Sequence, residues 1–311
     1  MSSNRKDIKS RIKTVQNTQK VTKSMKLIAI IKLKQLQNLL NLSKEYTKQV
    51  ANLIQKSFKQ IQKDSLDQSQ LTNLIKNNIK PEKAYKLFII VSSDRGLCGP
   101  FNSHLFKSLL HDIPANSPKV KFIVLGNKAI NFIQKTYGEN SITKKYGNLS
   151  LVPDKQLVSE ITEFIKTEFL NGKIISAQIY FNSFVSMVKS EIQDHFLLPF
   201  NQIIDEFQSI NKKQINPVST NYSETESDIK FEPHLAKTLE ILLPLYIENT
   251  IYQALIASRA GELANRVNAM TAATDNANTL ISQLTLTYNK ARQASITQEI
   301  SEIVAGAESL V

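Results

Sequence analysis

A chain of 311 residues with 41% apolar residues is long enough for one or two hydrophobic cores. Its single cysteine excludes an internal disulfide, and it has no run of about eighteen apolar residues of the kind that spans a bilayer. The net charge of +12 is concentrated in residues 1–63, where thirteen Lys and two Arg accompany only Asp7 and Glu45. These features exclude a disulfide-stapled secreted domain, and an intracellular or peripheral membrane location is expected.

Residues 4–62 are predicted to form one long helix. The chain has no Pro before Pro81 and no Gly before Gly96, and this absence favours uninterrupted helix. Apolar residues recur alternately every four and three positions, which is the heptad pattern of a coiled coil. At 1.5 Å per residue the helix would be about 90 Å long, and it needs a partner to cover its apolar seam. The predicted seam positions are Ile8, Ile12, Val15, Gln19, Thr22, Lys26, Ala29, Leu33, Leu36, Leu40 and Ser43.

The middle of the chain is predicted to be an α/β domain with a doubly wound, Rossmann-like sheet. Short apolar, β-branched runs typical of buried parallel strands alternate there with segments of helical periodicity. The predicted strands are 85–91, 120–125, 173–184 and 193–198, and the predicted helices are 102–111, 128–136 and 154–170. Segment 208–227, rich in Asn, Ser, Thr and Lys, is expected to be a loop.

The C-terminal part is predicted to be the partner helix. Neither Gly nor Pro occurs between Gly261 and Gly306, and a kink or a late start is expected at Pro244. The heptad stepping resumes at Leu263 and predicts a left-handed supercoil, antiparallel if both helices leave the middle domain on the same side. Its seam positions are Val267, Met270, Thr274, Ala277, Ile281, Leu284, Tyr288, Ala291 and Ser295. The predicted domains are therefore 1–80, 81–231 and 232–311.

The one local sequence with the form of a ligand site is Ser92–Gly99. It follows a predicted strand and precedes a predicted helix, where α/β enzymes place ligand groups. One interpretation is an enzyme in which Cys98, Asp94 and Arg95 form a reactive thiol site. The other is a tight turn permitted by its two glycines, with a small thiol packed beneath it. We favour the turn.

No other catalytic, metal or cofactor pattern is found. The sequence has no glycine-rich phosphate-binding loop, and its four histidines show no metal-ligand spacing. His104 and His111 lie seven residues apart on a predicted helix, and ordinary surface roles are expected for both. We therefore expect no catalytic residue, no metal and no cofactor.

The basic N-terminal helix allows two functional interpretations beside that of a solvated helix face. A row of lysines is typical of nucleic-acid binding, but the first aromatic residue of this helix is Tyr46, so base-stacking side chains are absent from most of it. The alternative is a protein partner of opposite charge. Salt-sensitive DNA affinity of the purified chain would support the first.

Four segments resemble the gamma subunits of F-type ATP synthases. They are residues 12–29 (IKTVQNTQKVTKSMKLIA), 93–99 (SDRGLCG), 268–277 (NAMTAATDNA) and 288–300 (YNKARQASITQEI). The segments lie at both ends and in the middle, so the resemblance covers the whole chain.

The resemblance implies a central stalk without a catalytic site. In that family the paired terminal helices turn inside a ring of three alpha and three beta subunits, driven by proton flow through a membrane c-ring. The implied partners are these subunits, the epsilon subunit and the c-ring, with no nucleic acid and no direct small-molecule substrate. The implied location is the cytoplasmic side of a bacterial inner membrane, as a peripheral subunit.

The resemblance also implies contact residues. Met25 would lie where the shaft meets a beta-subunit loop, near Arg266 of the opposing helix, whereas Phe231 and Glu232 would belong to the foot on the membrane ring. Small residues such as Ala260 and Ala264 would allow close helix approach and keep the outer shaft smooth. The predicted polar contacts with the catalytic ring are Arg292, Gln293 and Thr297.

Overall fold

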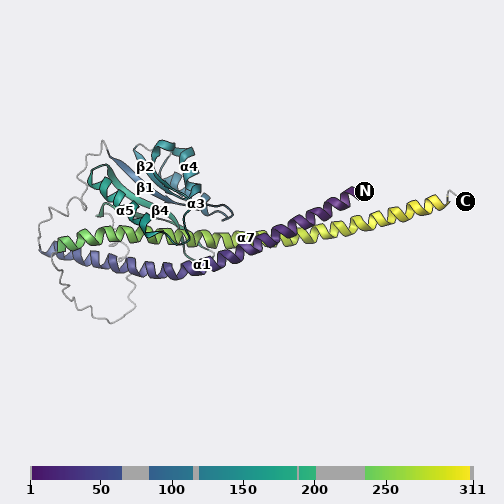
Figure 1. Cartoon of the computed structure of the whole chain (residues 1–311), viewed down its shortest axis with the longest axis horizontal. Helices are drawn as coiled ribbons and strands as arrows, with labels where there is room; N and C mark the ends of the chain where they lie inside the picture. Colours follow the sequence, from purple (N-terminus) through teal and green to yellow (C-terminus); the bar gives the residue numbers. More distant parts are fainter. Residues whose placement is uncertain (1, 65–83, 115–118, 188, 201–234, 309–311) are drawn as a thin grey trace, which may run out of the picture.

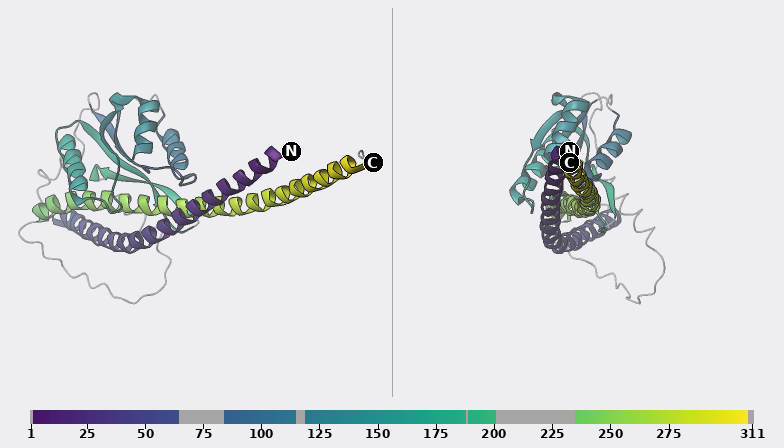
Figure 2. Two further views of the ribbon diagram at one scale, coloured as in Figure 1. Left: turned by 45° about the vertical axis from the view of Figure 1, so that its right-hand side comes forward. Right: turned by 90° about the vertical axis from the view of Figure 1, so that its right-hand side faces the viewer.

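The protein is a pair of very long helices with an α/β domain on one side (Figure 1). The computed structural model describes residues 2–64, 84–114, 119–187, 189–200 and 235–308. Both ends of the chain lie at the same end of the helix pair, and α7 lies between α1 and the sheet (Figures 1 and 2). Within the described ranges, no helix is long and apolar enough to cross a membrane.

The N-terminal helix α1 (Ser2–Asp64) confirms the predicted heptad seam. All eleven predicted seam positions are buried or half-buried, and Leu36 is fully buried. The pattern continues past the predicted stretch through Val50 and Ile54. Because α7 is the only described element against which α1 packs extensively, α1 is attached to the rest of the protein through this seam.

The C-terminal helix α7 (Leu235–Glu308) runs antiparallel to α1, as predicted. Two cross-helix polar pairs fix the register: Thr22 and Thr274 join their hydroxyl oxygens at 2.9 Å, and the Gln19 amide donates to the Asn278 side chain. The predicted late start at Pro244 is wrong, because α7 begins nine residues earlier and continues through the proline. Buried apolar side chains on both flanks hold the helix against the core despite the lost backbone N–H.

The domain is built on a five-stranded sheet of order β3-β2-β1-β4-β5. Its strands are β1 (Tyr85–Val91), β2 (Val120–Leu125), β3 (Ile142–Tyr146), β4 (Ile174–Phe184) and β5 (Ser190–Leu198). All pairings are parallel except that of β4 with β5, and the central Ile89 lies opposite Ile123 and Ile179. Strand β3 has no counterpart among the predicted strands, since it is a lysine-containing edge strand without an apolar run.

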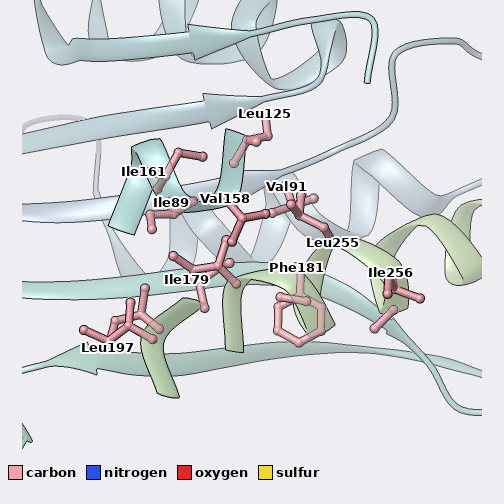
Figure 3. Packing of buried hydrophobic residues seen from close by; sticks show 14 of the residues in the cluster. Ile89, Val91, Leu125, Val158, Ile161, Ile179, Phe181, Leu197, Leu255 and Ile256 are labelled. Carbon is pink, nitrogen blue, oxygen red and sulfur yellow. The ribbon is translucent and has the colours of Figure 1, made fainter. Parts of the chain in front are cut away.

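Helices cover both faces of the sheet, which confirms the doubly wound architecture. They are α3 (Phe101–Asp112), α4 (Asn127–Tyr137) and α5 (Lys155–Leu170), with a single 3-10 turn at Glu139–Ser141. Helices α3 and α4 share a core with one face. Helices α5 and α7 pack on the other, where Val158, Ile179 and Leu255 meet between helix and sheet (Figure 3).

One hydrophobic core joins the helix pair to the sheet. It extends from the α1 seam across α7 to strands β1, β2 and β4. Ala260 and Ala264 lie inside this core, at 0% and 2% exposed, so their assignment to a smooth outer surface was wrong. They do allow the close helix approach that was predicted. The three predicted domain ranges stay a prediction, and their boundaries at 80/81 and 231/232 fall outside the described residues.

Candidate functional surface and polar junction

The predicted contact pair Met25 and Arg266 lies on one surface cavity. This cavity, of about 620 Å³, opens between α1, α7 and the loops that follow β1 and β3. Met25 and Ile28 line it from α1, and Arg266 lines it from α7. The structure therefore brings the two predicted residues to one site, and their contact with another subunit stays a prediction.

A largely buried network of two carboxylates and two guanidinium groups lines this cavity. Arg259 donates to Glu262 at 2.6 Å and to Asp94 at 3.2 Å, and Arg266 donates to the other oxygen of Glu262 at 2.6 Å. All four side chains are at most 17% exposed. Because two positive and two negative charges neutralise each other here, the network can stay out of water.

Asp94 connects this network to the loops at the carboxyl edge of the sheet. Its Oδ1 accepts the backbone N–H of Asn127 at 3.2 Å and of Asn148 at 2.9 Å, and its Oδ2 accepts that of Leu149 at 2.9 Å. Arg259 also donates to the carbonyl oxygen of Leu149. Both carboxylate oxygens of Asp94 are thus engaged in two hydrogen bonds each, and none is left for the chemistry of a catalytic carboxylate. Asp94 is therefore a structural residue that links α7 to the loops of the domain.

Arg259 and Glu262 were not predicted as site residues, although the sequence carries a signal for them. Between Ile251 and Met270 the only charged residues are Arg259, Glu262 and Arg266. Spacings of three and four residues place them on one face of a helix stretch that has no other charge. Three charges in such a stretch predict a paired, buried site.

Helix α7 occupies the place where a doubly wound sheet would normally bind a ligand. Such ligands lie beyond the carboxyl ends of the strands at the switch point, which here falls between β1 and β4. At Gly261, α7 passes so close that a Cβ atom would lie 2.9 Å from the backbone oxygen of Asn182 and 3.4 Å from the Phe101 ring. This crevice is therefore filled by the chain's own helix.

Cys98 has the surroundings of a packed thiol. It is 2% exposed, and the Asn102 amide donates to its sulfur at 3.4 Å. Burial, reinforced by the Glu262 carboxylate, raises the pKa of the thiol, which lowers the thiolate fraction at neutral pH. The turn interpretation is supported, although the left-handed residues are Leu97 and Gly99, and not Gly96.

The Cys98 thiol is expected to be inert in the folded chain at pH 7. Its reaction with a chromogenic disulfide should be more than about tenfold slower than in the urea-unfolded chain, because little thiolate is present or accessible. A Ser103→Cys variant, with a thiol at an exposed position of α3, provides the reactive control. Equal rates for Cys98 and the introduced thiol would restore the enzyme interpretation.

The other predicted contacts lie along the far part of α7 or outside the described residues. Arg292, Gln293 and Thr297 are exposed on α7, which continues past the N-terminal end of α1 (Figure 1). Exposed apolar side chains accompany them, including Ile296, at 46%, and Ile300, at 56%. The predicted foot residues Phe231 and Glu232 lie outside the described residues. His104 and His111 lie on α3, and among the described residues no three His, Cys, Asp or Glu side chains could hold a metal ion.

The basic face of α1 carries exposed apolar residues between its lysines. Val21, Leu27, Ile28 and Ile31 are each more than half exposed. Lys20, Lys23, Lys26 and Lys32 lie in the same stretch of helix. Such a mixed surface suits an acidic, partly apolar protein segment better than a phosphate backbone, since phosphates offer no apolar groups.

Comparisons with known proteins agree over the whole chain. A family model described as ATP synthase matches residues 4–310. The ATP synthase gamma chain of Halothermothrix orenii is 37% identical over 306 residues, 98% of either chain, and that of Glaesserella parasuis is 36% identical over 310 residues, 98% of this chain and 99% of the relative. Among solved structures, a chain of the Euglena gracilis mitochondrial ATP synthase (OSCP/F1/c-ring, rotational state 3) shares the fold, with a TM-score of 0.66 and 14% identity over 100% of this chain and 95% of that one.

Proposed function

We propose that this chain, which belongs to the ATP synthase gamma-chain family, is the non-catalytic central-stalk rotor that couples proton-driven rotation to ATP synthesis. The observation that carries this proposal is the antiparallel pair α1 and α7, which brings both termini to one end of a long shaft and leaves the sheet domain at the other. Family membership at this identity makes the nucleic-acid and thiol-enzyme interpretations unnecessary.

The mechanism follows from the stiffness and asymmetry of the shaft. A helix pair joined by a mainly apolar seam with two polar cross-helix pairs turns as one body, so rotation at the domain end reaches the far end of α7. The outer surface of α1 is basic, whereas the far part of α7 exposes mainly polar side chains. A surrounding ring therefore meets a different surface at each angle of the shaft. Each catalytic site is then biased by contacts that change with angle, which is allosteric coupling.

The partners and location follow from the same proposal. The shaft is surrounded by three alpha and three beta subunits, and the foot of the rotor binds the epsilon subunit and a membrane c-ring. The Euglena gracilis mitochondrial structures that share the fold are of the rotor and of an OSCP/F1/c-ring assembly, which supports a complex with F1 subunits and a c-ring. We place the complex on the cytoplasmic side of a bacterial inner membrane, with the chain as a peripheral subunit.

We assign the contacts with the ring to two parts of the shaft. Met25 and Arg266, on the cavity beside the basic face of α1, would meet an acidic beta-subunit loop. Arg292, Gln293 and Thr297, exposed on the far part of α7, would make polar contacts that form and break during rotation. Phe231 and Glu232 are proposed for the foot on the membrane ring.

The Arg292→Ala variant is expected to lower coupled ATP synthesis in membrane vesicles by about tenfold, since a hydrogen bond to a charged group contributes about 1.5–3 kcal/mol. The Gln293→Ala variant should have a smaller effect of the same sign, because its amide is neutral. Both residues are exposed, so the free energy of unfolding should change by less than about 0.5 kcal/mol.

The matched control is Gln283→Ala, which removes an exposed glutamine from the same helix outside the predicted contacts. Synthesis should be unchanged in this variant. Full synthesis by both Arg292→Ala and Gln293→Ala would refute the contact assignment. Failure of the chain to assemble with alpha and beta subunits would refute the rotor function itself.

A further inference from the structure

We propose that the buried network of Asp94, Arg259, Glu262 and Arg266 is an angular key, which fixes one rotational setting of α7 in the sheet domain. This inference rests on the proposed function, because a rotor must transmit torque between its domain and its shaft. It goes beyond that function by assigning the joint to four named side chains.

Helix α7 is the element that connects the sheet domain to α1. Among the described elements α1 packs extensively only on α7, whereas α7 also packs on β4, β5 and α5. Within the described residues, torque applied to the sheet domain therefore enters α7 mainly and reaches α1 through the seam. If α7 rotated relative to the sheet domain at their junction, rotation of the domain would no longer be transmitted to the helix pair.

Apolar packing specifies the rotational setting of α7 most sharply at Gly261, where a Cβ atom would lie 2.9 Å from the backbone oxygen of Asn182. Between Ala254 and Ala264 nearly every residue is buried, whichever side of the helix it lies on. Most of these residues are small or aliphatic, and hydrophobic attraction is not directional. Away from Gly261 and the α1 seam, such side chains bury similar area in more than one setting of the helix, so they add little to its angular specificity.

The charged residues remove this freedom. Arg259, Glu262 and Arg266 project from one face of α7, since they are three and four residues apart. Both guanidinium groups bind acceptors of the domain: Asp94 and the carbonyl oxygen of Leu149 accept from Arg259, and the carbonyl oxygen of Gly96 accepts from Arg266 at 3.3 Å. Glu262 pairs with both guanidinium groups within α7. A step of one residue is about 100° of helix rotation, and it would move both guanidinium groups away from these fixed acceptors.

Energetics supports an orienting role over a stabilising one. A buried ion network is often no more stable than apolar side chains of similar volume, because desolvation cancels much of its attraction. Its geometry is nevertheless demanding, since a guanidinium fork and a carboxylate bind only in a narrow range of orientations. Attachment is thus supplied by the apolar core, and the network adds angular specificity to that of the close approach at Gly261.

The test measures the angle between domain and shaft directly in the full-length chain. Spin labels on Lys135→Cys in α4 and Ser282→Cys in α7, both exposed positions, report a distance distribution by pulsed electron resonance. We expect Arg259→Met to broaden the distribution or add a second distance. The population of other settings should rise about tenfold or more, the effect of losing a hydrogen bond to a charged group. Arg259→Lys, which keeps the charge and loses the fork, should broaden it less.

The control is Glu160→Gln, which breaks an exposed ion pair with Lys144 at 2.7 Å within the domain, and it should leave the distribution unchanged. Should Arg259→Met not fold, Arg259→Lys carries the test, because it keeps the positive charge beside Glu262 and loses the guanidinium bonds to Asp94 and Leu149. An unchanged distribution in the folded variant would overturn the angular key. The measurement needs no other subunit, so this outcome is separate from a failure of the rotor function, which assembly with alpha and beta subunits tests.

Discussion

Replacement of Leu36 by alanine is expected to lower the free energy of unfolding by about 2–5 kcal/mol, the range for a large apolar side chain truncated in a packed core. Leu36 is fully buried in the seam and belongs to the core that joins α1, α7 and the sheet. The lost methyl groups would leave a cavity in the seam through which α1 packs on α7. Urea unfolding followed by circular dichroism measures the loss.

The matched control for this variant is Leu42→Ala. Leu42 lies on the same helix, less than two turns away, and is 70% exposed. The same chemical change should therefore alter the free energy of unfolding by less than about 0.5 kcal/mol. Equal losses for the two leucines would contradict the assignment of the seam, because burial would then not determine the effect.

Replacement of Gly261 by valine is expected to destabilise the chain by about 1–3 kcal/mol through overpacking. A side chain at this position meets the backbone oxygen of Asn182 at 2.9 Å, and a strand backbone in a five-stranded sheet cannot move aside. In an open helix the loss of glycine would instead be favourable, by up to about 1 kcal/mol for alanine. The sign of the effect therefore reports the close approach of α7 to the sheet.

Gly306 provides the control for this second variant. It lies in the same helix, and a Cβ atom added there would meet no heavy atom within 4 Å. Gly306→Val should leave the free energy of unfolding within about 0.5 kcal/mol of the parent chain. A gain of stability in Gly261→Val would show that α7 does not approach the sheet as closely as the structure describes.

The sequence by itself determined the long helices, because a heptad is a local and repeated signal. Every predicted seam position of α1, from Ile8 to Ser43, is buried or half-buried. The same holds for every predicted seam position of α7, from Leu263 to Ser295. Strands β1 and β2 were predicted at their observed bounds, since fully buried parallel strands are continuous apolar runs. Strand β3 escaped prediction because an edge strand needs no such run.

The exposed contacts of the shaft were predicted by resemblance, and their chemistry was not deducible from spacing. Arg292 and Gln293 are two polar residues among many on an exposed helix, and nothing in their local pattern separates them from Gln283. Their exposure in the structure is compatible with a contact role. The proposed experiment on coupled synthesis decides it.

Only the tertiary structure decided how the shaft is joined to the domain. Asp94 and Arg259 are 165 residues apart in sequence, and their pairing depends on α7 crossing the carboxyl edge of the sheet. A local pattern cannot encode that crossing, because it arises from the packing of an all-round apolar helix between a sheet and a second helix. The same packing converts Ser92–Gly99 from an apparent ligand loop into one side of a buried junction.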